Sequence, residues 1–550
     1  MNNYKTHFWL IAAFIFLFLL RFFRLSELGL HDYDAVTNFL AAKQLVEGNF
    51  SMLFHHAAPF LHIFDAFFYF VFQNNSTSFI FIVYGEAILQ ISAILFLCSI
   101  LKKDWKFSAT AAFFLAIFVG SSPLLVYSGR CLTIDNGSLV FLVLTLNQLQ
   151  KLIFKEVTNL KYTKLIHLSI YFAIAFGFNY KSILILPFIF GYLFYQNSIL
   201  NFIKKIIVFG VINILFVGFW TLIGQLLLGK WTAYLGNLYY LIFEAHQREV
   251  TGESWIEFDL LYYFKYTFFF ENPLIWIGMG MVIFSIIKKF LKRKESITKE
   301  NTNALSFDWK ELINQKIIFW LLFLASIALP TLFLEKAPRI WILVLLLAYA
   351  LSAWAFLFGE LLNKSGKWLL FLGIFYNCWL VMAHIYSYSA TSYNEATMYI
   401  KENLVTNELD KTEKIYLKGT LQPIPFLEKA KINYFILPQD FDTDSTINNK
   451  NILNSIDSIF YILTDDYCVL ANDCLEAESI MKDKKIKYSI RNQYAQKYQL
   501  LKEWKEPTLS EPFLYVEHSQ YLGLNFSESY DLWQKQAQDT TTIRLYKIFR

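Results

Sequence analysis

Long apolar runs separated by short polar loops fill the first 390 residues of the chain. A helix needs roughly 17–25 apolar residues to cross a bilayer. Runs of about this length occur at 7–24, 78–101, 108–128, 137–151, 164–179, 182–197, 204–228, 271–290, 316–333, 339–361 and 368–388. We therefore expect a multi-span α-helical membrane protein with about eleven transmembrane helices. Arg21, Arg24 and Glu27 lie at and just after the end of the first run in place of a small-residue cleavage site, so we expect this run to be a retained anchor.

The segment 25–77, between the first two runs, has a different pattern. Residues 35–47 repeat apolar positions at helical spacing and stop at Gly48, which predicts an amphipathic helix. Residues 59–73 are apolar, but the run is short and includes His62 and Asp65. We expect this second segment to form a helix that lies at the membrane interface.

The basic residues indicate the orientation of the chain. Lys and Arg gather after the second and eighth runs, between the fourth and fifth, before the seventh, and between the tenth and eleventh. The positive-inside rule places all these loops in the cytoplasm if the N-terminus is cytoplasmic. The outer side then receives 25–77, 129–136, 179–181, 229–270, 334–338 and everything after 388. We expect a multi-pass protein of the inner (plasma) membrane whose C-terminal region is periplasmic or extracellular.

Residues 391–550 differ from the rest of the chain, because the long apolar runs stop and charged residues become frequent. Helical stretches are expected at 394–404 and 474–483, and strands at 414–419, 432–438, 458–466, 499–506 and 542–550. This pattern predicts a transmembrane module at 1–390 followed by a soluble, extracytoplasmic α/β domain at 391–550.

Composition agrees with a membrane protein. Hydrophobic residues make up 56% of the chain and aromatic residues 19%. The net charge of +5 is modest, and topology accounts for the basic clusters, so we expect no nucleic-acid partner. Among the five cysteines, Cys468 and Cys474 lie close together in the predicted outer domain. They form either a small disulfide loop or two free thiols.

Carboxylates lie at two of the predicted outer turns. Asp32 and Asp34 follow the first apolar run, and Asp34 directly precedes the predicted helix 35–47. It is either an N-cap or a general base that activates an acceptor. Asp135 ends the turn that contains Arg130, a candidate for contact with a sugar. Asp135 is either the N-cap of the fourth run or a second carboxylate that positions the acceptor or the sugar of a donor.

Cations also lie at the outer side, where topology requires none. Lys181 sits where two apolar runs meet, and Lys336 and Arg339 share a short outer loop. An isolated Lys can snorkel to the interface, but Lys and Arg together suit a phosphate group. We therefore predict that these residues, with Arg248 as a further candidate, bind a donor phosphate.

The remaining candidates are aromatic residues and histidines. In the loop 229–268, Tyr240, Glu244 and His246 suit contact with a sugar or an acceptor, or form part of an interfacial belt. His55 and His56 are candidates for the same contacts and, beside Asp34, for a divalent metal. No second set of suitably spaced ligands is evident, so no cofactor is firmly predicted. The sequence also has no nucleotide-binding Gly-rich loop, which argues against a nucleotide-driven pump.

The chain resembles the GT-C superfamily of membrane glycosyltransferases. In pattern it is most similar to the bacterial family that contains the lipid A aminoarabinose transferase and the protein O-mannosyltransferases. The resemblance lies in the acidic motif of the first outer loop with its A-A-K-Q-L-V-E-G helix, the Y-S-G-R-x-x-x-x-D turn at 127–135, and the later Lys181 and E-K-A-P-R motifs. Family members usually have Asp-Glu where this chain has Asp34-Ala35, so Asp32 and Asp34 both remain candidate bases. They have a Lys-Pro-Pro type motif where this chain has His56-Ala57-Ala58-Pro59.

The resemblance implies an inverting glycosyltransferase with a polyprenyl-phosphate-linked donor and a lipid, glycan or protein acceptor. It implies that Asp34 is the base, that Asp135 supports the acceptor or donor, and that Lys181, Lys336 and Arg339 bind the donor phosphate. An alternative is a transporter or flippase of a lipid-linked sugar, which would place ionisable residues near the bilayer midplane. Glu86 and Gln90, in the second run, fit that alternative. A sensor or scaffold with an outer domain is a third hypothesis.

Overall fold

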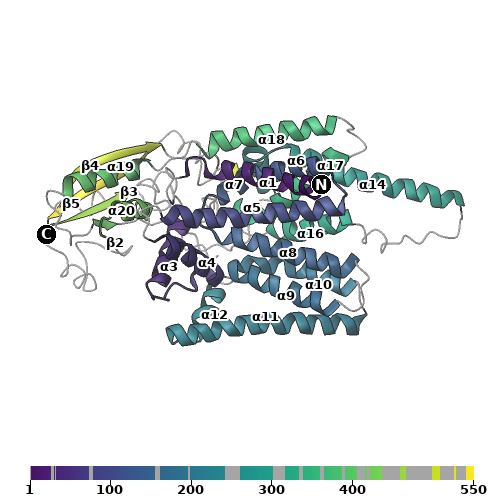
Figure 1. Ribbon diagram of the computed structural model, residues 1–550, viewed down its shortest axis with the longest axis horizontal. Helices are drawn as coiled ribbons and strands as arrows, with labels where there is room; N and C mark the ends of the chain where they lie inside the picture. Colours follow the sequence, from purple (N-terminus) through teal and green to yellow (C-terminus); the bar gives the residue numbers. More distant parts are fainter. Residues whose placement is uncertain are drawn as a thin grey trace.

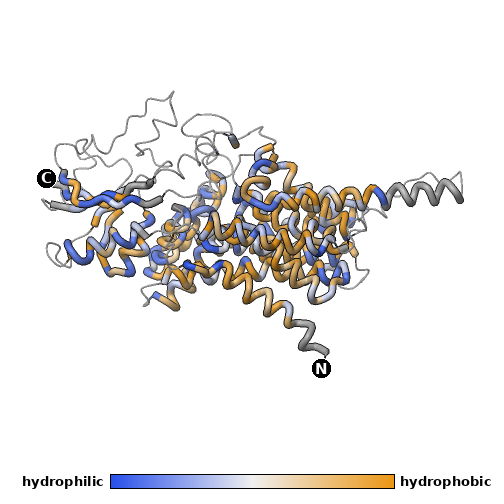
Figure 2. The backbone as a smooth tube through the Cα atoms, turned by 90° about the horizontal axis from the view of Figure 1, so that it is seen from above, coloured by the Kyte–Doolittle hydropathy of each residue, from blue (hydrophilic) through white to orange (hydrophobic). Residues whose placement is uncertain are grey.

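A computed structural model describes residues 2–25, 30, 33–73, 78–154, 161–195, 198–241, 261–300, 316–332, 338–358, 365–386, 391–405, 415–417, 421–436, 459–465, 498–507, 526–527, 530 and 540–549. The helices form a bundle, and a sheet-bearing domain lies at one end of it (Figure 1). Hydrophobic residues dominate the bundle, whereas the sheet end mixes hydrophobic and hydrophilic residues (Figure 2).

All eleven predicted apolar runs form helices. They are α1 (Asn2–Phe22), α5 (Ser78–Asp104), α6 (Ala109–Gly120) with α7 (Pro123–Ser128), α8 (Ile134–Phe154), α9 (Lys161–Phe178), η3 (Tyr180–Ile185) with α10 (Leu186–Tyr195), α11 (Ile199–Leu228), α14 (Leu274–Glu300), α16 (Lys316–Thr331), η5 (Pro338–Trp341) with α17 (Ile342–Phe358), and α18 (Ser365–His384). Within the described ranges, five helices are long and apolar enough to cross a membrane, and the apolar parts of the other helices are shorter. The fold is that of a multi-pass membrane protein, while the number of crossings remains a prediction.

One predicted run is divided into two helices by a buried carboxylate. The run 108–128 breaks at Ser121 and Ser122, between α6 and α7. The Glu271 carboxylate accepts hydrogen bonds from the Ser122 hydroxyl (3.0 Å) and the Leu124 amide (2.7 Å) at the start of α7. It also accepts one from the Tyr349 hydroxyl (2.6 Å). The Leu124 amide, which lies in the first turn of α7 and has no acceptor within the helix, is thereby satisfied inside the bundle.

Close helix packing depends on glycine at some positions and not at others. A Cβ built on Gly278 of α14 would lie 2.3 Å from the Ser352 Cβ of α17. The same atom on Gly280, two residues later, would meet nothing within 4 Å. Gly278 therefore permits the contact between α14 and α17, whereas Gly280 faces open space.

The segment between α1 and α5 forms α3 (Tyr33–Val46), the one-turn helix η1 (His55–Ala57) and α4 (Pro59–Phe72). Both helices expected in this segment are present. α4 packs beside α3, α5 and α9, and its His62 and Asp65 side chains are fully buried. The later segment 229–270 contributes α12 (Thr232–Tyr239) and α13 (Tyr262–Phe270).

The C-terminal domain contains all five predicted strands. It consists of α19 (Thr391–Tyr399), the π-helix η6 (Ile400–Leu404), β1 (Ile415–Leu417), α20 (Ile424–Ala430), β2 (Tyr434–Ile436), β3 (Ile459–Asp465), β4 (Tyr498–Pro507) and β5 (Thr540–Phe549). The strand order is β2-β1-β3-β5-β4. β1 is parallel to β2 and β3, whereas β5 is antiparallel to β3 and β4. The predicted helix 474–483 and the cysteines Cys468 and Cys474 lie outside the described residues.

The sheet domain rests on α3. Apolar residues of α3, such as Val36 and Phe39, share one buried core with residues of α19, α20 and the strands. Beside this core, Lys43 of α3 forms a 2.6 Å ion pair with Glu428 of α20. Tyr434 of β2 donates a second hydrogen bond to Glu428 (2.8 Å). The C-terminal domain thus packs against α3, the helix whose first turn contains Asp34.

Candidate active site

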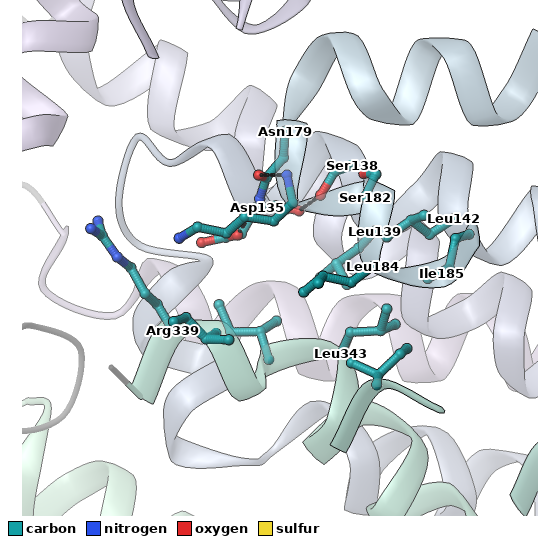
Figure 3. A pocket seen from close by; sticks show the side chains of 14 residues that line it. Asp135, Ser138, Leu139, Leu142, Asn179, Ser182, Leu184, Ile185, Arg339 and Leu343 are labelled. Atoms are coloured by element: carbon teal, nitrogen blue, oxygen red, sulfur yellow. Dashed lines mark hydrogen bonds between the residues drawn. The ribbon is translucent and has the colours of Figure 1, made fainter. Parts of the chain in front are cut away.

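A pocket lies where α8, η3, α16, η5 and α17 meet. It holds about 490 Å³ of empty space, part of it open to solvent. One end is polar, and its lining includes Asp135, Asn179, Lys181 and Arg339. The other end is lined by Leu and Ile side chains. Figure 3 shows Asp135 and Asn179 joined by a hydrogen bond at the polar end, with Leu139, Leu142, Leu184 and Ile185 beyond them.

Asp135 is held in place by an amide that sequence reasoning did not select. Asn179 donates from Nδ2 to the Asp135 carboxylate (2.7 Å), and its own oxygen accepts the Lys181 backbone N–H (2.9 Å). The Thr133 hydroxyl donates to the second Asp135 oxygen (3.1 Å). Asn179 therefore ends α9, starts η3 and joins two predicted site residues. The sequence feature that could have identified Asn179 is its place as a polar residue between two apolar runs.

Lys181 and Arg339 supply positive charge to the polar end. Lys181 follows the break at Asn179, and Arg339 lies in η5, the turn before α17. Both side chains line the pocket although the residues are far apart in the chain. The structure thus brings together Asp135, Lys181 and Arg339, three of the residues selected from the sequence.

Arg339 also connects the pocket to Asp34. The Arg339 Nη1 donates to the Asp34 Oδ2 at 3.0 Å. The other Asp34 oxygen, Oδ1, lies 3.6 Å from the His56 Nε2. The two groups on either side of Asp34 therefore come from η5 and η1, while Asp34 itself lies in the first turn of α3.

The turn that carries His56 has an uncommon backbone. His56 has φ of +53° and Ala57 has φ of +49°, so consecutive non-glycine residues adopt the left-handed region. Such a conformation costs on the order of 1–3 kcal/mol per residue and persists only where surrounding packing enforces it. Here the preceding Phe54 packs against Trp220 and Tyr234, in a buried cluster that includes Ala57. The fold therefore fixes the direction of the His56 side chain.

The charges around Asp34 favour its ionised form. Burial raises the pKa of Asp34, but the nearby His56 and Arg339 outweigh burial and lower that pKa below its usual range. His55, in the same turn, behaves differently. Burial, together with repulsion from His56, lowers the pKa of His55 to about 4, although Asp34 opposes this shift. Asp34 is thus held as an anion and His55 as a neutral imidazole near pH 7.

A polar network behind the site joins α1, α5 and α8. Arg21 donates from Nε to Gln90 (2.8 Å), and Gln90 donates to Asn136 (2.9 Å), the neighbour of Asp135. Arg130 was predicted to contact a sugar, but the structure places it in this support. It is buried, and its Nη1 donates to the backbone oxygens of Arg21 (2.8 Å) and Phe23 (2.7 Å). Arg130 is not among the residues that line the pocket, and its contact with a sugar stays a prediction.

The remaining candidates have the following places. Tyr240 lies at the end of α12, is exposed, and is not among the residues that line the pocket. Asp32, Glu244, His246, Arg248 and Lys336 lie outside the described residues. Within the described part of the chain, no group of three or more His, Cys, Asp or Glu residues suits a metal ion.

Comparison with known proteins identifies solved structures of similar architecture. No protein-family model matches the chain, and no curated protein matches it by sequence. The apo crystal structure of ArnT from Cupriavidus metallidurans matches with a TM-score of 0.56 and 9% identity, over 83% of this chain and 92% of that chain. ArnT and AglB, described next, are both GT-C superfamily glycosyltransferases. The chain has the GT-C fold.

Two ligand-bound structures with this fold are also similar to the chain. ArnT bound to undecaprenyl phosphate matches with a TM-score of 0.55 and 10% identity, over 88% of this chain and 95% of that chain. The archaeal oligosaccharyltransferase AglB from Archaeoglobus fulgidus, in complex with an inhibitory peptide and a dolichol-phosphate, matches with a TM-score of 0.55 and 11% identity. That match covers 100% of this chain and 89% of the AglB chain. The predicted GT-C-like architecture is therefore confirmed as a fold.

Proposed function

We propose that this protein is an inverting glycosyltransferase that moves a sugar from a polyprenyl-phosphate-linked donor to a lipid, glycan or protein acceptor. The observation that carries the proposal is the composition of the pocket. Its polar end contains Lys181 and Arg339, and its other end is lined by Leu and Ile. A polyprenyl phosphate has the same two parts, an anionic headgroup and an apolar chain.

The cations have a defined task in this reaction. When the bond between the anomeric carbon and the phosphate oxygen breaks, negative charge grows on the departing phosphate. Lys181 and Arg339 would stabilise that charge, because fixed cations in a water-poor site act strongly on a developing charge. Ligands of this class are present in the similar structures, where ArnT binds undecaprenyl phosphate and AglB binds a dolichol-phosphate.

The acceptor side is assigned to the region of Asp34. This carboxylate is ionised and partly open to solvent. It forms an ion pair with Arg339, which lines the pocket. An acceptor hydroxyl or amine bound beside it would lie next to a donor sugar whose phosphate is held in the pocket. Asp135 would position the donor sugar from the pocket side.

The predicted topology places this site at the outer face of the cytoplasmic membrane, with the residue range 391–550 as an extracytoplasmic domain. The reaction needs no nucleotide in that location, because the polyprenyl phosphate is both the leaving group and the membrane anchor.

A transfer assay with the purified protein in lipid nanodiscs tests the proposal. A mixture of undecaprenyl-phosphate-linked hexoses and pentoses serves as donor, and cell membranes supply acceptors. We expect the sugar to be transferred, and we expect much less transfer by the Lys181→Gln variant. The matched control is Lys102→Gln, which also removes one positive charge. Lys102 lies in the last turn of α5 and is not among the residues that line the pocket, so this variant should retain activity.

A flippase for lipid-linked sugars is the second candidate. Asp65 of α4 and Glu86 of α5 are fully buried, and none of their carboxylate oxygens has a hydrogen-bond partner among the described residues. Buried ionisable residues of this kind are frequent in transporters. Lipid scrambling across proteoliposomes without any sugar transfer would favour this candidate over the transferase.

A further inference from the structure

The Asp34 carboxylate is poorly placed to act alone as a base. Its Oδ2 accepts a 3.0 Å hydrogen bond from Arg339, and its Oδ1 faces the His56 ring. A carboxylate stabilised by two cationic or proton-bearing neighbours has a low affinity for another proton, and the strength of a general base falls with that affinity. The group that takes the acceptor proton should therefore lie next to Asp34.

We propose that His56 is the catalytic residue that takes the proton from the acceptor, and that Asp34 positions its imidazole. The inference rests on the proposed transfer function and divides the roles within that site. Imidazole is the side chain that changes its protonation near neutral pH. A carboxylate beside it fixes the tautomer and stabilises the imidazolium that forms.

The contact between the two side chains carries this assignment. The His56 Nε2 is buried, has no hydrogen-bond partner in the described part of the chain, and lies 3.6 Å from the Asp34 Oδ1. Catalytic hydrogen bonds are often this long before substrate binds. With Nε2–H directed at Asp34, Nδ1 is the ring nitrogen that accepts the proton.

The backbone supports the same conclusion independently. His56 and Ala57 have φ values of +53° and +49°, a conformation that favours glycine. Strain of this kind gathers at functional sites, where it fixes a side chain in one direction. Among the described residues, the titratable and charged groups around the His56 ring are Asp34 from α3 with its partner Arg339, His55 in the same turn, and His62 from α4.

The transfer step balances with this assignment. The acceptor oxygen or nitrogen forms a bond to the anomeric carbon, and the bond between that carbon and the phosphate oxygen breaks. The electron pair leaves with the polyprenyl phosphate. The acceptor proton moves to Nδ1 of His56, and the imidazolium then releases it to water or to the phosphate.

The test is the pH dependence of transfer by the full-length protein, wild type against His56→Asn. Asn adopts the left-handed region readily and cannot accept the proton, so this variant keeps the backbone of the turn. Transfer from the undecaprenyl-phosphate sugar mixture is measured over about pH 5–9. Wild-type transfer should fall toward acid pH, because the imidazole becomes protonated. His56→Asn should lose about 100-fold or more in rate and lack this acid limb.

Binding of undecaprenyl phosphate provides the second readout and should be unchanged in His56→Asn. Asp34→Asn should lower the transfer rate, because the imidazole loses the carboxylate that fixes its tautomer. The exposed His167 of α9, replaced by Asn, is the matched control and should behave as wild type.

The outcomes separate this inference from the proposed function. Full transfer by His56→Asn, an unchanged acid limb, or loss of undecaprenyl phosphate binding would overturn the role of His56 and leave the transferase intact. Absence of transfer by the wild type would overturn the proposed function, and the role of His56 with it.

Discussion

Replacing Arg339 by glutamine should weaken the binding of undecaprenyl phosphate without unfolding the protein. The guanidinium is largely buried, lines the pocket, and makes a 3.0 Å ion pair with Asp34. A phosphate oxygen bound in the pocket would lie beside this guanidinium. Glutamine keeps a polar side chain of similar reach but removes the charge.

The magnitude follows from the kind of contact. A hydrogen bond to a charged group contributes about 1.5–3 kcal/mol, and each 1.4 kcal/mol is about tenfold in affinity. Loss of one such contact to the phosphate therefore predicts a dissociation constant raised by about 10- to 150-fold. Arg339→Lys keeps the charge but loses the planar guanidinium, so its dissociation constant should fall between those of wild type and Arg339→Gln.

The assay is equilibrium binding of labelled undecaprenyl phosphate to the protein in nanodiscs. A control with farnesol, which has an apolar chain but no phosphate, should bind equally to wild type and Arg339→Gln. Equal binding of undecaprenyl phosphate by the two proteins would refute the reasoning, because Arg339 would then not meet the phosphate.

Three further predictions concern the support of the site and the fold. Lys43→Glu should destabilise the protein by about 2 kcal/mol and lower transfer, and adding Glu428→Lys should restore both. If the melting temperature of the double variant does not recover, the ion pair does not stabilise the contact between α3 and the C-terminal domain. Gly278→Ala should cost about 1–3 kcal/mol through overpacking between α14 and α17, whereas Gly280→Ala should leave the melting temperature unchanged, and equal effects would contradict this packing. The lowered pKa of Asp34 means that its carboxylate stabilises the fold above its unfolded-state pKa of about 4 and that this contribution declines as pH falls below that value. The melting temperature of wild type should therefore exceed that of Asp34→Asn at pH 7 by more than at about pH 3.5, and a gap that does not narrow in acid would oppose the ion-pair assignment.

The helices and strands were largely predictable because their signals are local. Apolar runs of sufficient length form helices wherever they occur, and all five short strands were visible as apolar stretches between polar ones. The breaks inside the runs were not predictable. The break at Ser122 depends on Glu271, which is 149 residues away in the chain. At Asn179 the boundary between two runs was predicted, but its hydrogen bond to Asp135 was not, because that partner lies on another helix.

The site shows the same division between local and distant information. Sequence reasoning selected Asp34, Lys181 and Arg339 by residue type and by predicted side of the membrane. It did not pair Asp34 with Arg339, because 305 residues separate them and only the folded bundle brings them together. Nor did it predict the buried hydrogen bonds of Arg130, since the acceptors are backbone oxygens near the end of α1. A sequence pattern carries no sign of such backbone contacts.

The central claim is that the pocket uses a polyprenyl-phosphate sugar as donor. The most direct measurement is single-turnover transfer by purified wild type in nanodiscs, with release of undecaprenyl phosphate followed alongside sugar transfer. We predict that both products appear together in equal amounts, and that a Lys181→Gln, Arg339→Gln double variant forms neither at a comparable rate. Scrambling of the intact donor between leaflets, with no release of undecaprenyl phosphate, would contradict the claim and indicate a flippase.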